Sequence, residues 1–302
     1  MSTSVGEALK SLVSRLTGSL GSPRAEAEEL LGRLLVCGRT ELYLARDRAL
    51  SHEEEQVLTQ WLQRRLRGEP IQYITGRAAF RGLDLAVTPA VLVPRPETEG
   101  LVEAVLDVLE AERGRWPRPR VLDLGTGSGA IALALASEWP AAIVVATDVS
   151  PEALAVARGN AATLGLEERV RFLPGHWFDA VPDDDRYEVV VANPPYVASA
   201  ERDLLPHDVR EHEPAGALFS GPTGFEALRE IVELAPRHLG AGGLLALELA
   251  ESRAHEVTVW LDGSRDWQEV SLRDDLAGRP RVLLARRQTG PAIAPAQWEE
   301  ER

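Results

Sequence analysis

The sequence predicts an α/β protein whose main domain is a parallel sheet with helices on both faces. From residue 120 onward, short apolar runs typical of buried strands alternate with segments of helical periodicity. A glycine-rich turn follows the first apolar run, and an Asn-Pro-Pro-Tyr turn follows the fourth. Both turns place unusual backbone at the end of a strand, where ligands bind in this class of fold.

Composition limits the classes of function. The chain has 302 residues, enough for two domains, and 44% of them are hydrophobic, enough for a sizeable core. A formal net charge of −14 argues against an extensive nucleic-acid surface, because phosphate binding relies on clustered Lys and Arg. Cys37 is the single cysteine and the six histidines show no ligand spacing, so we expect neither a disulfide nor a metal site. Without a signal peptide or a membrane span, the protein is expected to be cytoplasmic, with no membrane partner.

Residues 1–75 are expected to form a helical domain. Apolar residues recur at helical spacing after Pro23, and Ser51 with Glu54 forms a capping box before a long helix that ends near residue 67. Periodicity leaves two roles open for this domain: a lid or stabilising cap, or a platform that docks a partner.

A β-hairpin is expected to link the two domains. Strand-like runs at residues 72–76 and 80–87 predict it, and we place the linker at residues 76–94. The Pro-Arg-Pro-Glu-Thr-Glu segment at residues 94–99 then opens a helix that runs to about Glu112. Prolines suit the first turn of a helix, and acidic residues suit its N-terminus.

The main domain is expected over residues 95–287, with seven strands. These strands are 119–124, 142–147, 169–173, 187–192, 243–249, 267–272 and 281–286, and the helices between them are 129–138, 151–164, 224–239 and 251–261. The last two strands form a return pair, which predicts an antiparallel edge strand. Residues 197–223 are a long connection that either folds over the site or stays a solvated loop. The tail at residues 288–302 is expected to be disordered.

The glycine-rich turn indicates a nucleotide-type cofactor. Gly125, Gly127 and Gly129 alternate, and glycine allows positive φ and lets a ligand touch the backbone. Asp148 ends the next strand, 23 residues beyond Gly125, where a doubly wound fold places the carboxylate that holds a ribose. The glycines also fit a dinucleotide fingerprint. Asp123, two residues before the first glycine, and the Asn-Pro-Pro-Tyr turn favour S-adenosylmethionine over NAD.

The Asn-Pro-Pro-Tyr turn at residues 193–196 predicts a stiff polar clamp. Each proline holds φ at about −65° and removes a backbone donor. The side chain of Asn193 offers one carbonyl acceptor and one amide donor group. These groups are expected to grip a planar –NH2 group and to aim its nitrogen.

From about Glu26 to Arg286, the chain resembles the protein-glutamine N5-methyltransferases of the HemK type, which modify peptide chain release factors. The resemblance rests on residues 69–76, residues 93–99, the glycine-rich turn, residues 193–196, and the Asp-Leu-Ala-Gly segment at 275–278 with Arg281. It implies a Rossmann-like, seven-stranded S-adenosylmethionine-dependent methyltransferase fold with a small N-terminal helical bundle and a linking β-hairpin. It also implies that the bundle helps to hold the release factor, whose Gly-Gly-Gln loop carries the target glutamine.

The resemblance implies roles for individual residues. The cofactor-binding residues would be Gly125, Thr126, Gly127, Ser128, Gly129, Asp148, Trp177 and Asn193. The substrate-binding residues would be Asn193, Pro194, Pro195 and Tyr196, of which Asn193, Pro194 and Tyr196 would be catalytic. The chain departs from the family at His176, where an acidic residue is expected. Either a contact with the adenine is altered there, or His176 is a surface histidine at a strand end.

Two other functions remain open. An adenine-N6 methyltransferase acting on DNA or RNA uses the same grip on an exocyclic amine, but the acidic charge and the lack of a basic, aromatic-rich recognition domain argue against it. A protein that binds S-adenosylmethionine only to sequester a partner would have no use for an intact amine clamp.

Overall fold

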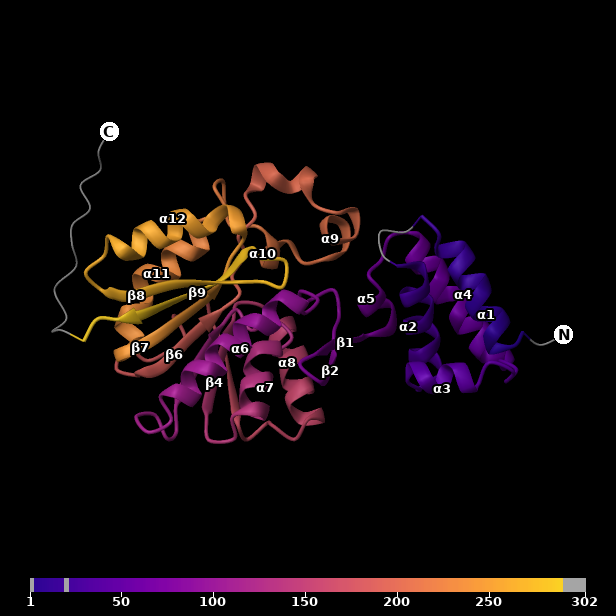
Figure 1. Ribbon diagram of the computed structural model, residues 1–302, viewed down its shortest axis with the longest axis horizontal. Helices are drawn as coiled ribbons and strands as arrows, with labels where there is room; N and C mark the ends of the chain where they lie inside the picture. Colours follow the sequence, from indigo (N-terminus) through magenta and orange to yellow (C-terminus); the bar gives the residue numbers. More distant parts are fainter. Residues whose placement is uncertain (1–2, 19–21, 290–302) are drawn as a thin grey trace.

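The structure, a computed structural model, describes residues 3–18 and 22–289. A bundle of helices at the N-terminus stands beside a seven-stranded sheet that carries helices on both faces (Figure 1). The tail expected to be disordered lies outside the described residues from residue 290 onward. Within the described ranges, no helix combines the length and the apolar character needed to cross a membrane.

The N-terminal bundle has an apolar core of its own. Its helices are α1 (Val5–Leu16), α2 (Pro23–Leu35), α3 (Arg39–Leu44) and α4 (His52–Leu66). The predicted capping box begins α4: the backbone N–H of Glu54 donates to Ser51 Oγ at 3.1 Å, and that of Ser51 donates to Glu54 Oε2 at 2.8 Å. Leucines from all four helices, Leu12 and Leu30 among them, pack into one cluster. A largely buried ion pair between Arg65 and Glu26, at 2.7 Å, ties α4 to α2.

The linker differs from its prediction at two points, because the first expected strand is a helix and the second, at residues 80–87, contains the turn of the hairpin at residues 81–82. The first strand-like run is a short helix, α5 (Ile71–Thr75), and the hairpin follows it as β1 (Arg77–Phe80) and β2 (Leu83–Ala86). Three of the five residues of α5 are buried, and Gly76 ends the helix with φ at 71°. So short an apolar run has no period that separates strand from helix, and packing decides its structure.

All seven predicted strands are present. They are β3 (Arg120–Leu124), β4 (Ile143–Asp148), β5 (Val170–Pro174), β6 (Tyr187–Ala192), β7 (Leu239–Glu248), β8 (Trp267–Asp274) and β9 (Pro280–Arg287). Their order in the sheet is β5-β4-β3-β6-β7-β9-β8. The return pair is antiparallel, as predicted, and β9 lies inside the sheet, antiparallel to both β7 and β8. The strand that opposes the rest is therefore β9, while β8 forms the edge.

Helices bury both faces of the sheet (Figure 1). They are α6 (Pro96–Ala111), α7 (Ala130–Glu138) and α8 (Pro151–Thr163) on one face and α11 (Glu226–His238) and α12 (Glu251–Asp262) on the other. Successive residues of one strand enter opposite layers: Val121 packs with α6 and α7, whereas Leu122 packs with α11 and α12. Burial on both sides explains why the parallel strands are continuous apolar runs in the sequence.

The long connection at residues 197–223 is folded against the protein. It contains a 3-10 helix (Ser199–Leu204), α9 (His207–His212) and α10 (Ala215–Leu218). Glu213, whose side chain is 1% exposed, pairs with Arg95 at the start of α6. In Figure 1, α9 lies between the sheet and the bundle, and a Cβ added to Gly68 at the end of α4 would come within 2.9 Å of the His207 ring. These contacts favour a segment that folds over the site.

Candidate active site

The two predicted motifs meet because of the strand order. The chain builds the sheet outward from β3 in one direction and from β6 in the other, so these neighbours mark the point where the strand order reverses. Ligands bind at the carboxyl ends of the strands at such a point. The register pairs Leu124 with Ala192, so Gly125 and Asn193 leave the sheet side by side.

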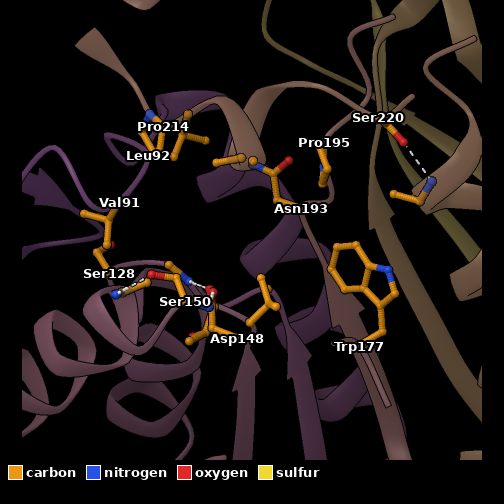
Figure 2. Close-up of a pocket in the computed structure, with 18 of the residues that line it drawn as sticks. Val91, Leu92, Ser128, Asp148, Ser150, Trp177, Asn193, Pro195, Pro214 and Ser220 are labelled. Atoms are coloured by element: carbon orange, nitrogen blue, oxygen red, sulfur yellow. Dashed lines mark hydrogen bonds between the residues drawn. The ribbon is translucent and has the colours of Figure 1, made fainter. Parts of the chain in front are cut away.

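A cavity of about 710 Å³ opens at this place, within the range of small-molecule sites. In Figure 2, Asn193 and Pro195 lie across the cavity from Asp148, and Trp177 closes one end. The predicted site residues that line it are Gly125, Thr126, Gly127, Ser128, Asp148, Trp177, Asn193 and Pro195.

Three predicted site residues do not line the cavity: Gly129, Pro194 and Tyr196. Gly129 begins α7 with φ at 84°, and a Cβ there would come within 3.0 Å of Leu133 Cδ1. Glycine is therefore required at this position by the tight turn from β3 into α7. Pro194 is buried, and Tyr196 packs against the core beneath α11 and α12, where burial raises the pKa of its hydroxyl to about 12.

The carboxylate of Asp148 is held at the mouth of the glycine-rich turn. Its Oδ2 accepts from the backbone N–H of Gly127 at 2.8 Å, and its Oδ1 accepts from that of Ser150 at 2.9 Å. Gly127 has φ at 56°. Any residue that carries a Cβ atom would be strained in this conformation, so the turn favours glycine here. Both carboxylate oxygens are therefore oriented before any ligand arrives.

Trp177 lies against the glycine-rich turn. A Cβ added to Gly125 would stand 3.0 Å from Cζ3 of the indole, so this close approach depends on glycine. The backbone carbonyl of Trp177 accepts from Thr147 Oγ1 at 2.9 Å, which fixes the residue to the end of β4. The indole Nε1 is buried and has no hydrogen-bond partner among the described residues.

Asp123 lies behind the turn and does not line the cavity. It is fully buried, and burial raises the pKa of its carboxyl group to about 7. The hydroxyl of Thr126 donates to its Oδ2 at 2.6 Å. This contact couples the buried carboxyl group to the glycine-rich turn.

The side-chain amide of Asn193 has one firm partner. Its Nδ2 donates to Oγ1 of Thr98 at 3.1 Å, and Thr98 is itself 4% exposed. From the sequence, Thr98 was assigned only to the start of a helix and to a segment that marks the family. In the structure, Pro94, Arg95 and Thr98 of this segment line the cavity. The signal that could have identified Thr98 was a hydroxyl group within a segment that the resemblance already singled out.

His176 lines the cavity and is also open to solvent. Its side chain is 47% exposed, and its Nδ1 lies 3.3 Å from Oε1 of Glu230 on α11. Its ring centroid is 5.1 Å from that of Trp177. The histidine that replaces the expected acidic residue thus has an acidic partner of its own beside the indole.

Comparisons with known proteins agree with this architecture. A family model described as the PrmC N-terminal domain matches residues 7–76, and one described as the methyltransferase small domain matches residues 102–210. The hMettl16 catalytic domain, solved in complex with a MAT2A 3'UTR hairpin, is similar with a TM-score of 0.52 at 15% identity, covering 81% of this chain and 84% of that one. At this identity the likeness shows the fold alone.

Curated relatives match nearly the whole chain. The release factor glutamine methyltransferase of Koribacter versatilis is 41% identical over 271 residues, which cover 89% of this chain and 92% of the relative. That of Bordetella pertussis is 42% identical over 90% of this chain and 97% of the relative. With this identity spread over both domains, the chain belongs to the release factor glutamine methyltransferase family.

Proposed function

We propose that this protein transfers a methyl group from S-adenosylmethionine to the side-chain amide nitrogen, N5, of the glutamine in the Gly-Gly-Gln loop of peptide chain release factors. The observation that carries the proposal is the register of β3 and β6, which brings the glycine-rich turn and Asn193 to one cavity. The names of relatives about 40% identical over most of the chain support the substrate.

The residues present fit S-adenosylmethionine. Gly125 and Gly127 leave backbone open to the methionine part, Asp148 offers oriented oxygens to the ribose hydroxyls, and Trp177 offers an indole face beside the adenine. A ligand that reaches the indole Nε1 would also relieve a buried donor that lacks a partner among the described residues. When bound, the cofactor supplies an electrophilic methyl carbon on a sulfonium.

The protein's own contribution is to position a weak nucleophile. The lone pair of a carboxamide nitrogen is delocalised into its carbonyl group. Asn193 lines the cavity, and its Oδ1 accepts one N–H bond of the glutamine. For the second N–H bond we assign the backbone carbonyl of Pro194, whose side chain is buried outside the cavity lining. The two acceptors favour a tetrahedral nitrogen with its lone pair aimed at the methyl carbon. The same acceptors stabilise the positive charge that grows on nitrogen. Alignment in the cavity makes the transfer effectively unimolecular, and the extra proton leaves nitrogen afterwards.

The remaining residues of the turn support this clamp. Pro195 lines the cavity next to Asn193, and Tyr196 anchors the turn by packing into the core. We place the docking of the release factor on residues 1–75, joined through a linker at 76–94 to the catalytic domain at 95–287. The separate core of the bundle and its contact with the segment over the cavity support this division.

The decisive experiment uses cofactor with a tritiated methyl group. The protein should label an intact release factor, and changing the loop glutamine to alanine should abolish the label. Label that survives the change would place the methyl group on another residue. Retention on a nucleic-acid column that falls with salt would point instead to a nucleic-acid substrate. Cofactor binding without any transfer would leave only a binding role.

A further inference from the structure

We propose that the loop between β8 and β9, residues 275–279, is a docking contact for the release factor and that Leu276 is its apolar anchor. The proposal rests on the proposed function and adds to it a surface on the catalytic domain, separate from the helical bundle. Residues 275–278 and Arg281 mark the family in the sequence, yet they do not line the cavity. Their role is therefore still to be assigned.

The loop lies at the edge of the sheet where the cavity opens. Because β9 is antiparallel to both β7 and β8, β8 runs in the direction of the parallel strands and ends at their carboxyl edge. The register agrees, since Glu248 at the end of β7 pairs with Val282 near the start of β9. Two strand spacings, about 10 Å, separate β9 from β6. Figure 1 shows the loop on the side of the sheet where α10 lies.

Hydrogen bonds to one carboxylate hold the loop in a defined shape. Asp275 Oδ1 accepts from the backbone N–H of Ala277 at 2.8 Å and from that of Arg279 at 3.1 Å. The backbone N–H of Asp275 donates in turn to the carbonyl oxygen of Arg279 at 2.8 Å. Gly278 has φ at 74°, which glycine adopts without strain. The loop is therefore ordered before a partner binds, and its ordering costs little on association.

Arg281 fixes the loop to the chain that leaves β7. Its Nη1 donates to the carbonyl oxygen of Leu249 at 3.3 Å, and the backbone N–H of Leu249 donates to the carbonyl oxygen of Arg281 at 3.0 Å. Its Nη2 lies 3.7 Å from Oδ2 of Asp275. Leu249 directly follows β7, the neighbour of the strand that carries the clamp. Both parts of the family marker thus set the position of the loop relative to the site.

The side chain that this loop presents is apolar. Leu276 is fully exposed, more than any other large apolar side chain among the described residues. Removing such a side chain from water is favourable in proportion to its apolar area. A large apolar side chain on a loop that is already ordered has the properties of an anchor in a protein interface.

Exposed apolar side chains gather at this edge of the catalytic domain. In the described part of residues 95–287, the large ones are Ile143, Val149, Leu204, Val259 and Leu276. Val149, Leu204 and Leu276 belong to segments that follow β4, β6 and β8, whereas Ile143 begins β4 and Val259 lies on α12. Val149 also lines the cavity next to Asp148, where we place the cofactor. Two leucines at the carboxyl edge are then left for a protein partner.

The occupant that fits this surface is the release factor. Its loop glutamine has to reach Asn193, so the protein around that loop comes to lie over the carboxyl edge, where Leu276 stands. A second copy of this chain fits less well, because each copy carries a formal net charge of −14 and the two would repel each other. We therefore expect Leu276 to contact the domain that carries the Gly-Gly-Gln loop.

The experiment measures kcat and KM for methylation of an intact release factor. Leu276→Ser should raise KM roughly tenfold, the effect of truncating one apolar anchor, while kcat stays within about twofold. Leu276→Met keeps an apolar side chain and should keep the wild-type KM. The Tm should not change in either variant, because the side chain is exposed in the free protein. A short Gly-Gly-Gln peptide does not extend to the loop, so its KM should be the same for all three proteins.

Val259→Ser is the matched control, since it removes an exposed apolar side chain from α12. It should leave KM unchanged. The inference is overturned by a wild-type KM in Leu276→Ser, by an equal rise in Val259→Ser, or by an equal rise with the short peptide. Sedimentation that shows a wild-type dimer lost in Leu276→Ser would assign the surface to a second copy instead. Wild-type protein that never labels glutamine contradicts the proposed function, whereas normal labelling with an unchanged KM in Leu276→Ser contradicts this inference alone.

Discussion

In the reaction that we propose, a single side-chain amide, that of Asn193, selects for an –NH2 group. Its two neighbours in the turn are prolines, which have no backbone N–H, so the turn itself offers acceptors to a substrate amide. The amide nitrogen is engaged by Thr98, which leaves Oδ1 to face the ligand. The clamp therefore matches a group that brings two hydrogens.

The first prediction removes this acceptor. Asn193→Ala should lower kcat roughly 100- to 1,000-fold, the loss expected for one preorganised polar contact in a transition state. The cofactor Kd, measured by calorimetry, should change little, because the glycine-rich turn and Asp148 remain. Asn193→Asp keeps the shape and an acceptor, and it controls for the loss of volume. Normal methylation by Asn193→Ala would exclude the positioning role of this amide.

The second prediction concerns the pH dependence of stability at Asp123. Burial raises the pKa of this carboxyl group to about 7 in the folded state, above its ordinary value of 3.8. The stability that Asp123 contributes is then fully present below the unfolded-state pKa and is lost as pH rises through about 7. The side chain of the Asp123→Asn variant does not titrate. Between pH 5 and pH 8, its free energy of unfolding should therefore rise relative to that of the wild type by on the order of a few kcal/mol. Urea unfolding at the two pH values checks this, and an equal difference at both would refute it.

Among the structural elements, the turn after β6 is shaped by a glycine from the other end of the long connection. Gly224 has φ at 80°, and a Cβ there would stand 2.7 Å from the backbone carbonyl oxygen of Tyr196 and 2.9 Å from the backbone nitrogen of Ala198. The two ends of the segment at residues 197–223 therefore lie against each other, next to the Asn-Pro-Pro-Tyr turn. Its middle is held by the pair between Arg95 and the buried Glu213.

The third prediction tests this contact. Gly224→Ala should destabilise the protein by about 1–2 kcal/mol through its positive φ alone. The added Cβ should also displace the clamp and lower kcat. Gly165→Ala is the control, because Gly165 has φ at 68° with open space where the Cβ would lie. It should show the same cost in thermal unfolding with kcat unchanged. Equal kcat values for the two variants would exclude a role of Gly224 in shaping the clamp.

In the whole molecule, the helical bundle is tied to the catalytic domain through the hairpin. Arg33 of α2 pairs with Asp84 of β2 at 2.8 Å, and Arg81 at the hairpin turn pairs with Glu138 of α7. Further contact comes from α9, which lies against Gly68. The bundle is therefore held to the rest of the protein at the hairpin and at α9.

The fourth prediction follows from the proposal that the release factor docks on residues 1–75, away from the nitrogen that is methylated. A short peptide that carries Gly-Gly-Gln should be methylated with a much lower kcat/KM than an intact release factor, since it forfeits the binding energy of remote contacts. The cofactor Kd should be the same in both assays, which serves as the internal control. Equal kcat/KM values for peptide and intact factor would remove the docking role from residues 1–75.

Much of this architecture was predictable from local sequence. Continuous apolar runs predicted the central strands, such as β3, β6 and β7, because strands buried on both faces have no polar side to display. The edge strands β5 and β8 mix polar with apolar residues and are only partly buried. The capping box at Ser51 and the helix start at residues 94–99 were predictable because their contacts lie within one turn. The helix at Ile71–Thr75 was predicted wrongly, because five residues are too few to show a period.

The sequence by itself determined the strands, the turn of glycines that can host a cofactor, and the amide clamp that follows β6, since each depends on neighbours along the chain. Only the tertiary structure decided that β9 lies inside the sheet, that Tyr196 packs away from the cavity, and that Thr98 lies beside Asn193. The hydrogen bond between Thr98 and Asn193 joins residues 95 positions apart. No local pattern encodes such a contact, because it arises when strand order and helix packing bring distant segments together.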